Sequence, residues 1–417
     1  MRILYFSVAP VSFSDEHPGM NGMSWISSLV RVVSPYEGVK IGITYVNDRK
    51  ERKGEETKDN VTIIPMNIHR TKMQIRSFDS KSYRWLDDLT ISKSVEVVER
   101  FRPDVIHVFG SEWCFGLIAQ HVKVPVVIHM QGFWPVYRNV NLYNEDNVGG
   151  LLKRWLCHPK TYWDDKRMMR LSRERAEREI KIIKGNRFFM GRTEWDLSLI
   201  RMLNPLATYF KVAEPLRKDF LDYAGSWRVH DDGVVHLMTV GTSSIKGMDV
   251  VLKAAHILQE NSSKSFSWHV FGGQPDMETL KRWTGLSTQD VGVVFEGSAD
   301  AKRLVVALQH ADIFVHATYA DNSPNCICEA QMIGLPVITT YAGGISSLFN
   351  DNYDKDLFVP INDPYYLASK IIELRGDKDR MARLSQMNAE TAQLRHDDKK
   401  IAEALVRSYR EMVGSEN

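Results

Sequence analysis

Residues 320–338 read ADNSPNCICEAQMIGLPVI, and this run carries the clearest indication of the fold. The pattern predicts the end of a strand, then a loop, a helix and a second strand. Ser323 is a favoured N-cap residue, Pro324 suits the first helical position, and Gly334 suits the residue just past a helix end. The run therefore predicts a helix that begins at Ser323 and Pro324.

The same alternation of elements extends in both directions along the chain. Short β-rich runs are separated by longer segments with helical spacing, which is the pattern of parallel α/β domains. The first half has such runs at 3–9, 40–46, 61–66, 105–110, 125–130 and 187–192. The second half has them at 234–241, 265–271, 291–297, 313–318, 336–340 and 357–360. We therefore predict an α/β protein with two doubly wound, Rossmann-like sheets in tandem.

The length of the chain agrees with two domains. Its 417 residues fit two units of about 200 residues each. Residues 204–232 contain prolines and a charged stretch, so they predict the connection between the domains. We place the domains at 1–217 and 218–396. Apolar residues at helical spacing predict a terminal amphipathic helix over about 397–414.

Composition excludes several classes of protein. With 43% hydrophobic and 25% charged residues and a formal net charge of +2, the chain is typical of an ordinary globular protein with no nucleic-acid partner. Four cysteines form neither a disulfide framework nor a zinc pattern, which indicates a reducing compartment and no metal. No signal peptide and no run of about 18 apolar residues is present. We expect a cytoplasmic protein and leave surface attachment to a membrane open.

The start of the predicted helix suggests an anion site. Free backbone N–H groups in the segment from Ser323 to Cys326, together with the positive end of the helix dipole, favour a diphosphate, so Ser323, Pro324 and Asn325 are expected at the donor. Asp321 precedes the helix and Glu329 lies within it. Carboxylates accept hydrogen bonds from hydroxyl groups, so Asp321 can hold a sugar and Glu329 a ribose. The alternative is that Asp321 reinforces the cap and Glu329 is solvated.

Residues 320–338 resemble the signature of family 4 glycosyltransferases, in which two acidic residues separated by seven precede Ala and then Gly-x-Pro-Val-Ile. In that family the first acid contacts the donor sugar and the second the ribose, so the resemblance implies these roles for Asp321 and Glu329. Asp321 stands where the family usually has Glu. The resemblance also implies a GT-B fold with a C-terminal helix that crosses back to the first domain. It further implies retention of anomeric configuration without a metal or cofactor.

Other motifs of the second half match the same family. The run 241–247, GTSSIKG, is similar to the family's turn before a Lys-Gly pair, so Lys246 is expected to neutralise the leaving diphosphate. Thr242 replaces the usual arginine, and its hydroxyl and that of Ser243 are expected to contact the donor instead. Glycines let backbone approach a ligand closely, although a plain tight turn is an equal alternative. Further donor contacts are expected from Gly272, Gly343 and Gly344.

The first half supplies weaker candidates. Gly22 belongs to a loop that resembles the family's glycine loop beside the reacting sugar. Gln131 stands where the family often has a histidine that contacts the donor sugar, and His129 is either a second contact or a core residue. Arg192 and Glu194 follow the last predicted strand of this domain, where ligands of such sheets collect. They are candidates for acceptor or phosphate binding, with an internal ion pair as the alternative.

Residues 153–187 are rich in Lys and Arg, with interleaved aromatic residues. Such a segment can lie on an anionic membrane surface, which suits an enzyme with a lipid-linked acceptor. The interspersed Glu174, Glu177 and Glu179 favour the alternative, an ordinary solvated helix with side-chain pairs.

We therefore expect a retaining, metal-independent hexosyltransferase, with Lys246, Asp321 and Glu329 as its catalytic residues. The donor is a nucleotide-diphosphate sugar of UDP or GDP type, and the acceptor is a glycan, free or lipid-linked, in polysaccharide or glycoconjugate assembly. The protein is expected in the cytoplasm or on the inner face of the membrane. Alternatives are a small-molecule acceptor, an inverting epimerase-like enzyme of the same fold, and a catalytically silent subunit that binds nucleotide sugars.

Overall fold

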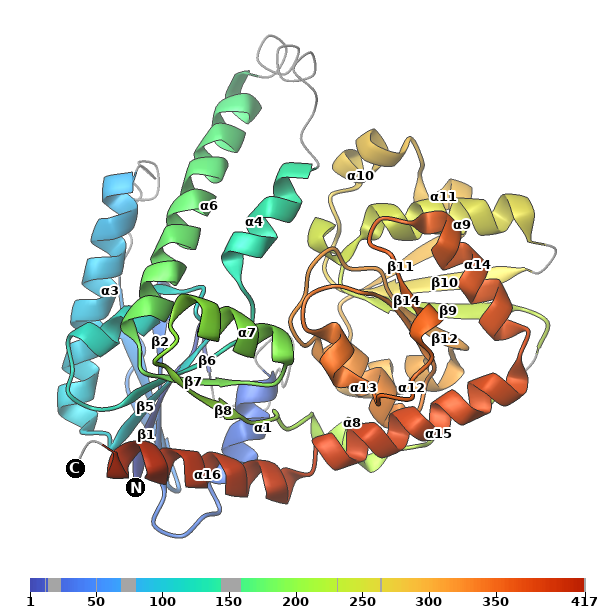
Figure 1. Cartoon of the computed structure of the whole chain (residues 1–417). Helices are drawn as coiled ribbons and strands as arrows, with labels where there is room; N and C mark the ends of the chain where they lie inside the picture. The colour runs from blue at the N-terminus through green and yellow to red at the C-terminus, as the bar shows by residue number, and fades with distance from the viewer. Residues whose placement is uncertain are drawn as a thin grey trace.

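The computed structural model shows two α/β domains side by side, each built on a largely parallel sheet (Figure 1). The architecture confirms the predicted fold class. The structure describes residues 1–11, 13, 24–49, 51–68, 80–143, 159–230, 232–262 and 265–415.

The N-terminal sheet has eight strands in the order β3-β4-β2-β1-β5-β6-β7-β8, with only β3 antiparallel to its neighbour. All six predicted runs of the first half are strands. The strands are β1 (Arg2–Phe6), β2 (Lys40–Asn47), β3 (Glu56–Lys58), β4 (Val61–Asn67), β5 (Val105–Phe109), β6 (Val126–His129), β7 (Phe188–Gly191) and β8 (Thr208–Lys211).

Two strands of this sheet were not predicted. The β3 strand is fully exposed and reads Glu-Thr-Lys, so it has no apolar pattern. The β8 strand lies within 204–232, the stretch predicted to hold the connection between the domains, and it ends before the predicted boundary at 217. Both are edge strands, so few of their side chains enter the core and the apolar signal is weak.

Helices cover both faces of the N-terminal sheet. Because side chains alternate along a strand, Ile3 and Tyr5 pack on one face with α1 and α16, while Leu4 and Phe6 pack on the other with α3, α6 and α7. This two-sided burial explains why the strands read as continuous apolar runs. The helices are α1 (Ser24–Val33), α3 (Ser80–Phe101), η1 (Cys114–Gln120), α4 (Trp134–Tyr143), α6 (Pro159–Gly185) and α7 (Glu194–Leu203).

The C-terminal sheet has six parallel strands in the order β11-β10-β9-β12-β13-β14. The order reverses between β9 and β12, and ligands of open α/β sheets bind at the carboxyl ends of strands beside such a reversal. All six predicted runs of the second half are strands. They are β9 (Val235–Val240), β10 (Phe266–Phe271), β11 (Val293–Gly297), β12 (Ile313–His316), β13 (Val337–Thr340) and β14 (Phe358–Val359).

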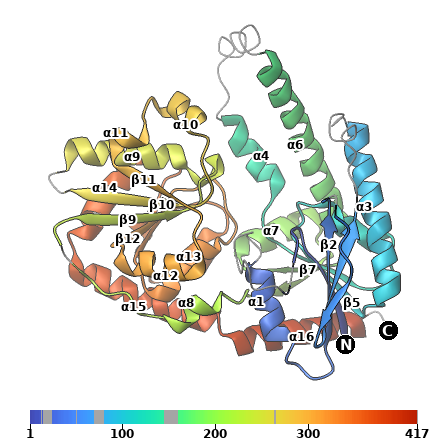
Figure 2. The same ribbon diagram turned by 180° about the vertical axis from the view of Figure 1, so that it is seen from behind.

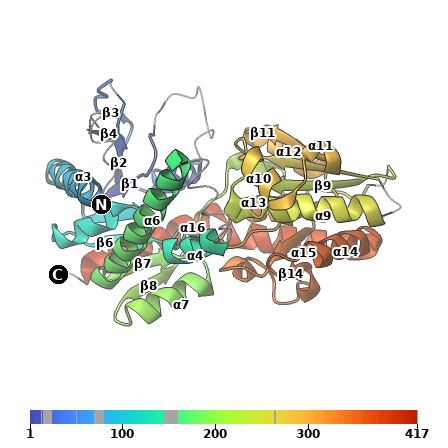
Figure 3. The same cartoon turned by 90° about the horizontal axis from the view of Figure 1, so that it is seen from above.

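Helices also cover the C-terminal sheet, as the view from above shows (Figure 3). Helix α9 contacts α10, α11 and α14, whereas α12 contacts α8 and α13. The elements are α8 (Lys218–Asp222), η2 (Ser244–Lys246), α9 (Met248–Asn261), α10 (Met277–Thr284), α11 (Thr288–Val291), α12 (Ala301–His310), α13 (Asn325–Ile333), η3 (Ile345–Leu348), η4 (Lys355–Leu357), α14 (Pro364–Arg375) and α15 (Lys378–Arg395).

The chain ends in α16 (Asp398–Gly414), which returns to the N-terminal domain and lies beside α1 (Figure 2). Its apolar residues Leu405 and Tyr409 are fully buried in the same core as Tyr5 of β1. An ion pair between Arg31 and Asp398, 2.5 Å long, joins α1 to the first turn of α16. The predicted crossing of the C-terminal helix is confirmed.

Within the described residues, no helix combines the length and the apolar character needed to cross a membrane.

Replacement of Leu405 by alanine should lower the free energy of unfolding by about 2–5 kcal/mol, because it leaves a cavity in the core that α16 closes. Guanidinium unfolding followed by circular dichroism measures this change. Glu403→Ala, exposed on the same helix, is the control and should stay within about 0.5 kcal/mol of wild type. If the two variants had the same free energy of unfolding, α16 would not close this core.

Candidate functional site

Helix α13 begins at the C-terminal end of β12, one residue later than predicted. Pro324 is the N-cap residue, with extended backbone, and its carbonyl accepts a hydrogen bond of 3.1 Å from Ile327 N–H. The assignment of the cap to Ser323 is therefore wrong. The Ser323 hydroxyl is buried and bonds to no side chain or backbone group that the structure describes. The helix ends at Gly334 in the left-handed conformation, as predicted.

Gly343 and Gly344 pack against the loop before α13 and do not face an open surface. Gly344 N–H donates a 3.0 Å hydrogen bond to the carbonyl of Asp321. Gly343 has φ of 54°, and a Cβ there would collide with the same carbonyl oxygen. The two glycines thus let two backbone segments approach closely, which is the tight-turn alternative of the sequence analysis.

A partly buried ion pair lies beside the start of α13. The Lys246 ammonium contacts Asp321 Oδ2, and His316 Nε2 lies 3.2 Å from the same oxygen. Burial alone would raise the pKa of Asp321, but Lys246 and His316 together hold that pKa well below its ordinary value. The Asp321 charge outweighs burial at Lys246 and raises its pKa. Both groups are therefore charged at neutral pH. His316 was not predicted.

Backbone contacts fix the turn that carries Lys246. Tyr319 N–H and the Thr318 hydroxyl both donate to the carbonyl of Ile245, at 2.8 and 2.9 Å. These bonds join η2 to the loop after β12 and so place Lys246 against Asp321.

The other residues of this domain that were predicted to contact the donor lie at the ends of neighbouring strands. Thr242 is half-buried and Ser243 is exposed. Gly272 follows β10, and its N–H donates to Gly297 at the end of β11, at 3.0 Å.

Glu329 is buried in α13 and is held by an arginine from the connection between the domains. Arg217 donates to Glu329 Oε1 from Nε at 2.9 Å and from a terminal nitrogen at 2.7 Å. Burial raises the pKa of Glu329, and Arg217 opposes that shift. Arg217 belongs to none of the motifs recognised in the sequence, and so it was missed.

The N-terminal domain faces this site with a buried polar cluster. An Arg192 terminal nitrogen donates to Asn325 Oδ1 at 2.9 Å and lies 3.1 Å from Glu214 Oε2. Gln131 donates to Glu214 Oε1 at 2.5 Å, and His129 Nε2 lies 3.4 Å from that oxygen. The structure thus brings together three predicted residues, Gln131, His129 and Arg192, through Glu214, which was missed.

His129 belongs to the core of the N-terminal domain. It lies 3.2 Å from His107, which lies 2.6 Å from the Tyr409 hydroxyl. Burial lowers the pKa of His129 to about 3 and the pKa of His107 well below its ordinary value, so both rings are neutral. His107 is packed in the same core.

Two other predicted residues do not join this cluster. Glu194 points to the surface, where it pairs with Lys211 at 2.7 Å. Gly22 lies outside the described residues.

Direct hydrogen bonds hold the start of α13 against the N-terminal domain. The Thr193 hydroxyl donates to Asn322 Oδ1 at 2.6 Å, and Asn322 Nδ2 donates to Asp196 Oδ2 at 3.1 Å. Glu194 N–H donates to Ser347 Oγ at 3.1 Å, a third link between the domains. The N-terminus of α13 therefore faces the interface of the two domains.

A carboxyl pair lies at the carboxyl end of the N-terminal sheet. Glu179 of α6 accepts hydrogen bonds from the Ser111 hydroxyl and, at 2.7 Å, from Trp134 N–H. Burial, and then the nearby Glu112, raise the pKa of Glu179 to about 8, and burial raises the pKa of Glu112. The interpretation of Glu179 as a solvated helix residue is wrong, since it is fully buried.

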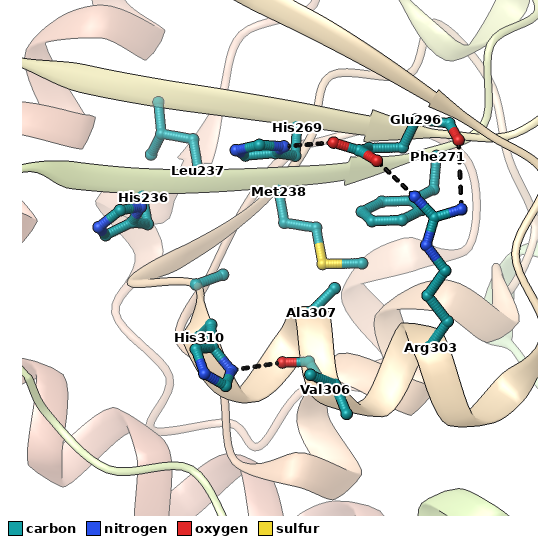
Figure 4. Close-up of a pocket in the computed structure, with 11 residues that line it drawn as sticks. His236, Leu237, Met238, His269, Phe271, Glu296, Arg303, Val306, Ala307 and His310 are labelled. Carbon is teal, nitrogen blue, oxygen red and sulfur yellow. Dashed lines mark hydrogen bonds and ion pairs between the residues drawn. The ribbon is translucent and has the colours of Figure 1, made fainter.

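A separate cavity of about 290 Å³ lies between α12 and strands β9 to β11 (Figure 4). On its wall Glu296 contacts both His269, at 2.7 Å, and Arg303. None of the predicted site residues lines it. Across the described ranges, no cluster of three or more His, Cys, Asp or Glu side chains suits a metal ion.

Sequence comparisons match part of the chain. Residues 234–377 match the family model described as Glycosyl transferases group 1. TuaC of Bacillus subtilis, which is named as a teichuronic acid biosynthesis glycosyltransferase, is 28% identical over 164 residues, 39% of each chain. An uncharacterized glycosyltransferase of Methanocaldococcus jannaschii is 23% identical over 130 residues, 31% of this chain and 33% of that protein. Each match spans well under half of the relative's length.

Solved structures match the whole chain. A sucrose-phosphate synthase from Thermosynechococcus elongatus has a TM-score of 0.69 at 16% identity, with 99% of each chain covered. HepE of Anabaena, in complex with UDP and glucose, has a TM-score of 0.62 at 13% identity over 99% of this chain and 100% of that one. A trehalose 6-phosphate synthase from Burkholderia multivorans has a TM-score of 0.69 at 11% identity over 100% and 99%. The chain therefore has the GT-B fold.

The raised pKa of Glu179 predicts a pH-dependent stability. In the folded protein Glu179 keeps its proton up to about pH 8, whereas in the unfolded chain it ionises near 4.5. Between these values the folded state binds more protons, so its stability falls as the pH rises. Glu179→Gln stays neutral, so its melting temperature should fall less than that of wild type between about pH 5 and about pH 8.5.

The control is Glu177→Gln, an exposed residue of the same helix, which should keep the wild-type dependence. Equal losses of melting temperature in wild type and Glu179→Gln would contradict a protonated Glu179.

Proposed function

We propose that this chain is a glycosyltransferase that moves a hexosyl-type sugar from a nucleotide-diphosphate donor to a glycan acceptor. The observation that carries the proposal is the charged Lys246–Asp321 pair beside the start of α13. It lies within 234–377, the segment that matches the group 1 family model. It also lies at the interface of the two domains, where a donor and an acceptor can meet.

In this proposal the donor diphosphate binds at the N-terminus of α13. The free backbone N–H groups of the first turn and the positive dipole end favour an anion there. Lys246 adds a full positive charge from the C-terminal domain. Arg192, held on Asn325, contributes from the N-terminal domain a guanidinium that it shares with Glu214. The Glu329 carboxylate, oriented by Arg217, is suited to accept hydrogen bonds from the ribose.

The reaction breaks the bond between the anomeric carbon and the diphosphate oxygen, and it forms a bond from that carbon to an acceptor oxygen. Negative charge grows on the leaving diphosphate, where Lys246 and the start of α13 stabilise it. The proton of the acceptor hydroxyl passes to a leaving phosphate oxygen, so no protein base is required. Retention of configuration and independence from metal are proposed from the resemblance of residues 320–338 to family 4.

The nature of the substrates is inferred from neighbours. HepE was solved with UDP and glucose, which supports a UDP-type donor, with GDP as the alternative. The name of TuaC supports a polysaccharide acceptor. Trp163 and Met168 are 63% and 50% exposed on α6, a helix that projects from the N-terminal domain (Figure 1). These apolar side chains among basic residues support a lipid-linked acceptor and a peripheral position on the inner face of the membrane.

A panel of UDP-, GDP- and ADP-sugars tests this proposal, because a ligand bound only by the native state raises the melting temperature. One nucleotide class should raise it, and the wild-type protein should release that nucleotide when acceptor glycans are added. Lys246→Ala should lower turnover by about 10²–10³-fold, the usual cost of removing one group that stabilises developing charge.

Lys399→Ala, exposed on α16, is the control and should keep wild-type turnover. If Lys246→Ala kept wild-type turnover, Lys246 would not have the proposed role of stabilising the leaving diphosphate. Binding of a nucleotide sugar without transfer to any acceptor would favour a silent subunit instead.

A further inference from the structure

A cavity of about 430 Å³ opens at the carboxyl ends of the first strands of the N-terminal sheet. Its wall includes Ala9, Asp48 and Glu112, which follow β1, β2 and β5. Helices α3, α4 and α6 and the turn η1 supply the rest of the wall. The carboxyl ends of parallel strands are where ligands of such sheets bind, and the volume is within the range of small-molecule sites, about 300–1,000 Å³.

We infer that this cavity holds the acceptor, that the acceptor enters as an uncharged sugar ring, and that Glu112 positions its attacking hydroxyl. This inference rests on the proposed function and specifies its second substrate.

Tyr137 lies near both Glu112 and the Lys246–Asp321 pair. A Cβ at Gly132 would lie 2.5 Å from both Glu112 Oε1 and the Tyr137 hydroxyl, so the missing side chain of Gly132 lets these two groups converge. Helix α4, which carries Tyr137, contacts the turn η2 that ends at Lys246. Burial, and then the charges of Asp321 and Glu112, raise the pKa of Tyr137, which lies close to both acids. Glu112 therefore lines the cavity and lies beside Tyr137, which is itself close to Asp321 of the proposed donor site.

The charges on the wall favour a neutral ligand. Arg178 makes two hydrogen bonds to Asp87, at 2.8 and 2.9 Å, and a third of 2.7 Å to the Glu112 carbonyl. Its positive charge is thus balanced inside the protein. Across the whole wall the acids Asp48, Asp87 and Glu112 outnumber the cations Arg175 and Arg178. A phosphorylated acceptor would meet these acids, whereas sugar hydroxyls can both donate to and accept from carboxyl groups.

Two tryptophans give the cavity its apolar surface. Trp113 is 48% exposed on the wall, and Trp134 also lines the cavity, with Arg175 over its ring at 5.2 Å. Flat aromatic surfaces beside a few placed polar groups are the usual lining of a small-molecule site. A sugar ring presents an apolar face to such a surface and hydroxyls at its rim.

Glu112 then acts on the acceptor and not on the donor. Its carboxylate accepts a hydrogen bond from the attacking hydroxyl and aims that oxygen at the anomeric carbon. The bond from this oxygen to the anomeric carbon forms while the bond to the diphosphate breaks. The hydroxyl proton ends on the leaving phosphate, so Glu112 undergoes no net change. Loss of Glu112 should therefore affect acceptor kinetics and leave donor binding intact.

The test uses three variants of the full chain. Glu112→Gln removes the acceptor carboxylate, Trp113→Ala removes the exposed ring, and Trp85→Ala is the matched control. Trp85 is 45% exposed on α3 and does not line the cavity. Melting temperatures confirm folding of each variant. Probes are methyl glycosides of common hexoses and the corresponding sugar 6-phosphates, with binding measured by ligand-observed NMR in the presence of UDP.

Wild type and Trp85→Ala should bind at least one methyl glycoside in preference to its phosphate, and Trp113→Ala should lose that binding. Glu112→Gln should bind the donor like wild type and lower kcat/KM for the acceptor by about 10²-fold, the loss expected when a reacting group is misplaced by about 1 Å. The inference is overturned if no methyl glycoside binds, if the phosphates bind better, or if both variants keep wild-type acceptor binding and kinetics. Failure of the wild type to bind any nucleotide sugar would instead overturn the proposed function, while cavity binding remains measurable.

Discussion

The partly buried contact between Lys246 and Asp321 is the interaction on which the arrangement of the site depends. Two charges taken out of water lose much of their hydration energy, and a single ion pair does not reliably recover it. Neighbouring groups hold the pair in place. His316 lies beside Asp321, and hydrogen bonds from the Thr318 hydroxyl and Tyr319 N–H fix the turn that carries Lys246. Such a pair beside an open helix N-terminus provides a positive charge that an incoming diphosphate can share.

The site also depends on the position of the start of α13, which faces the N-terminal domain. Asn322 and Asn325 bond to Thr193, Asp196 and Arg192, all from the segment that follows β7. Helix α16 connects the same two domains from the opposite end of the chain. The two domains are therefore held together at both places, and a donor bound on the C-terminal domain would contact groups of the N-terminal domain.

Much of the fold could be predicted because strands buried on both faces leave continuous apolar runs in the sequence. Edge strands such as β8 leave no such run, and the cap at Ser323 was misplaced by one residue because several nearby residue types suit a helix start. Glu214 and Arg217 were missed because their roles come from contacts with residues distant in the sequence. Glu179 looked like a solvated helix residue, and only the packing of α4 on α6 buries it.

A crystal structure of the chain with a non-transferable UDP-sugar analogue would locate the donor. We expect diphosphate oxygens within hydrogen-bond distance of the first N–H groups of α13 and of the Lys246 ammonium, with the sugar against Asp321. A nucleotide bound elsewhere, such as in the cavity beside α12 shown in Figure 4, with the Lys246–Asp321 pair unchanged, would contradict this donor site.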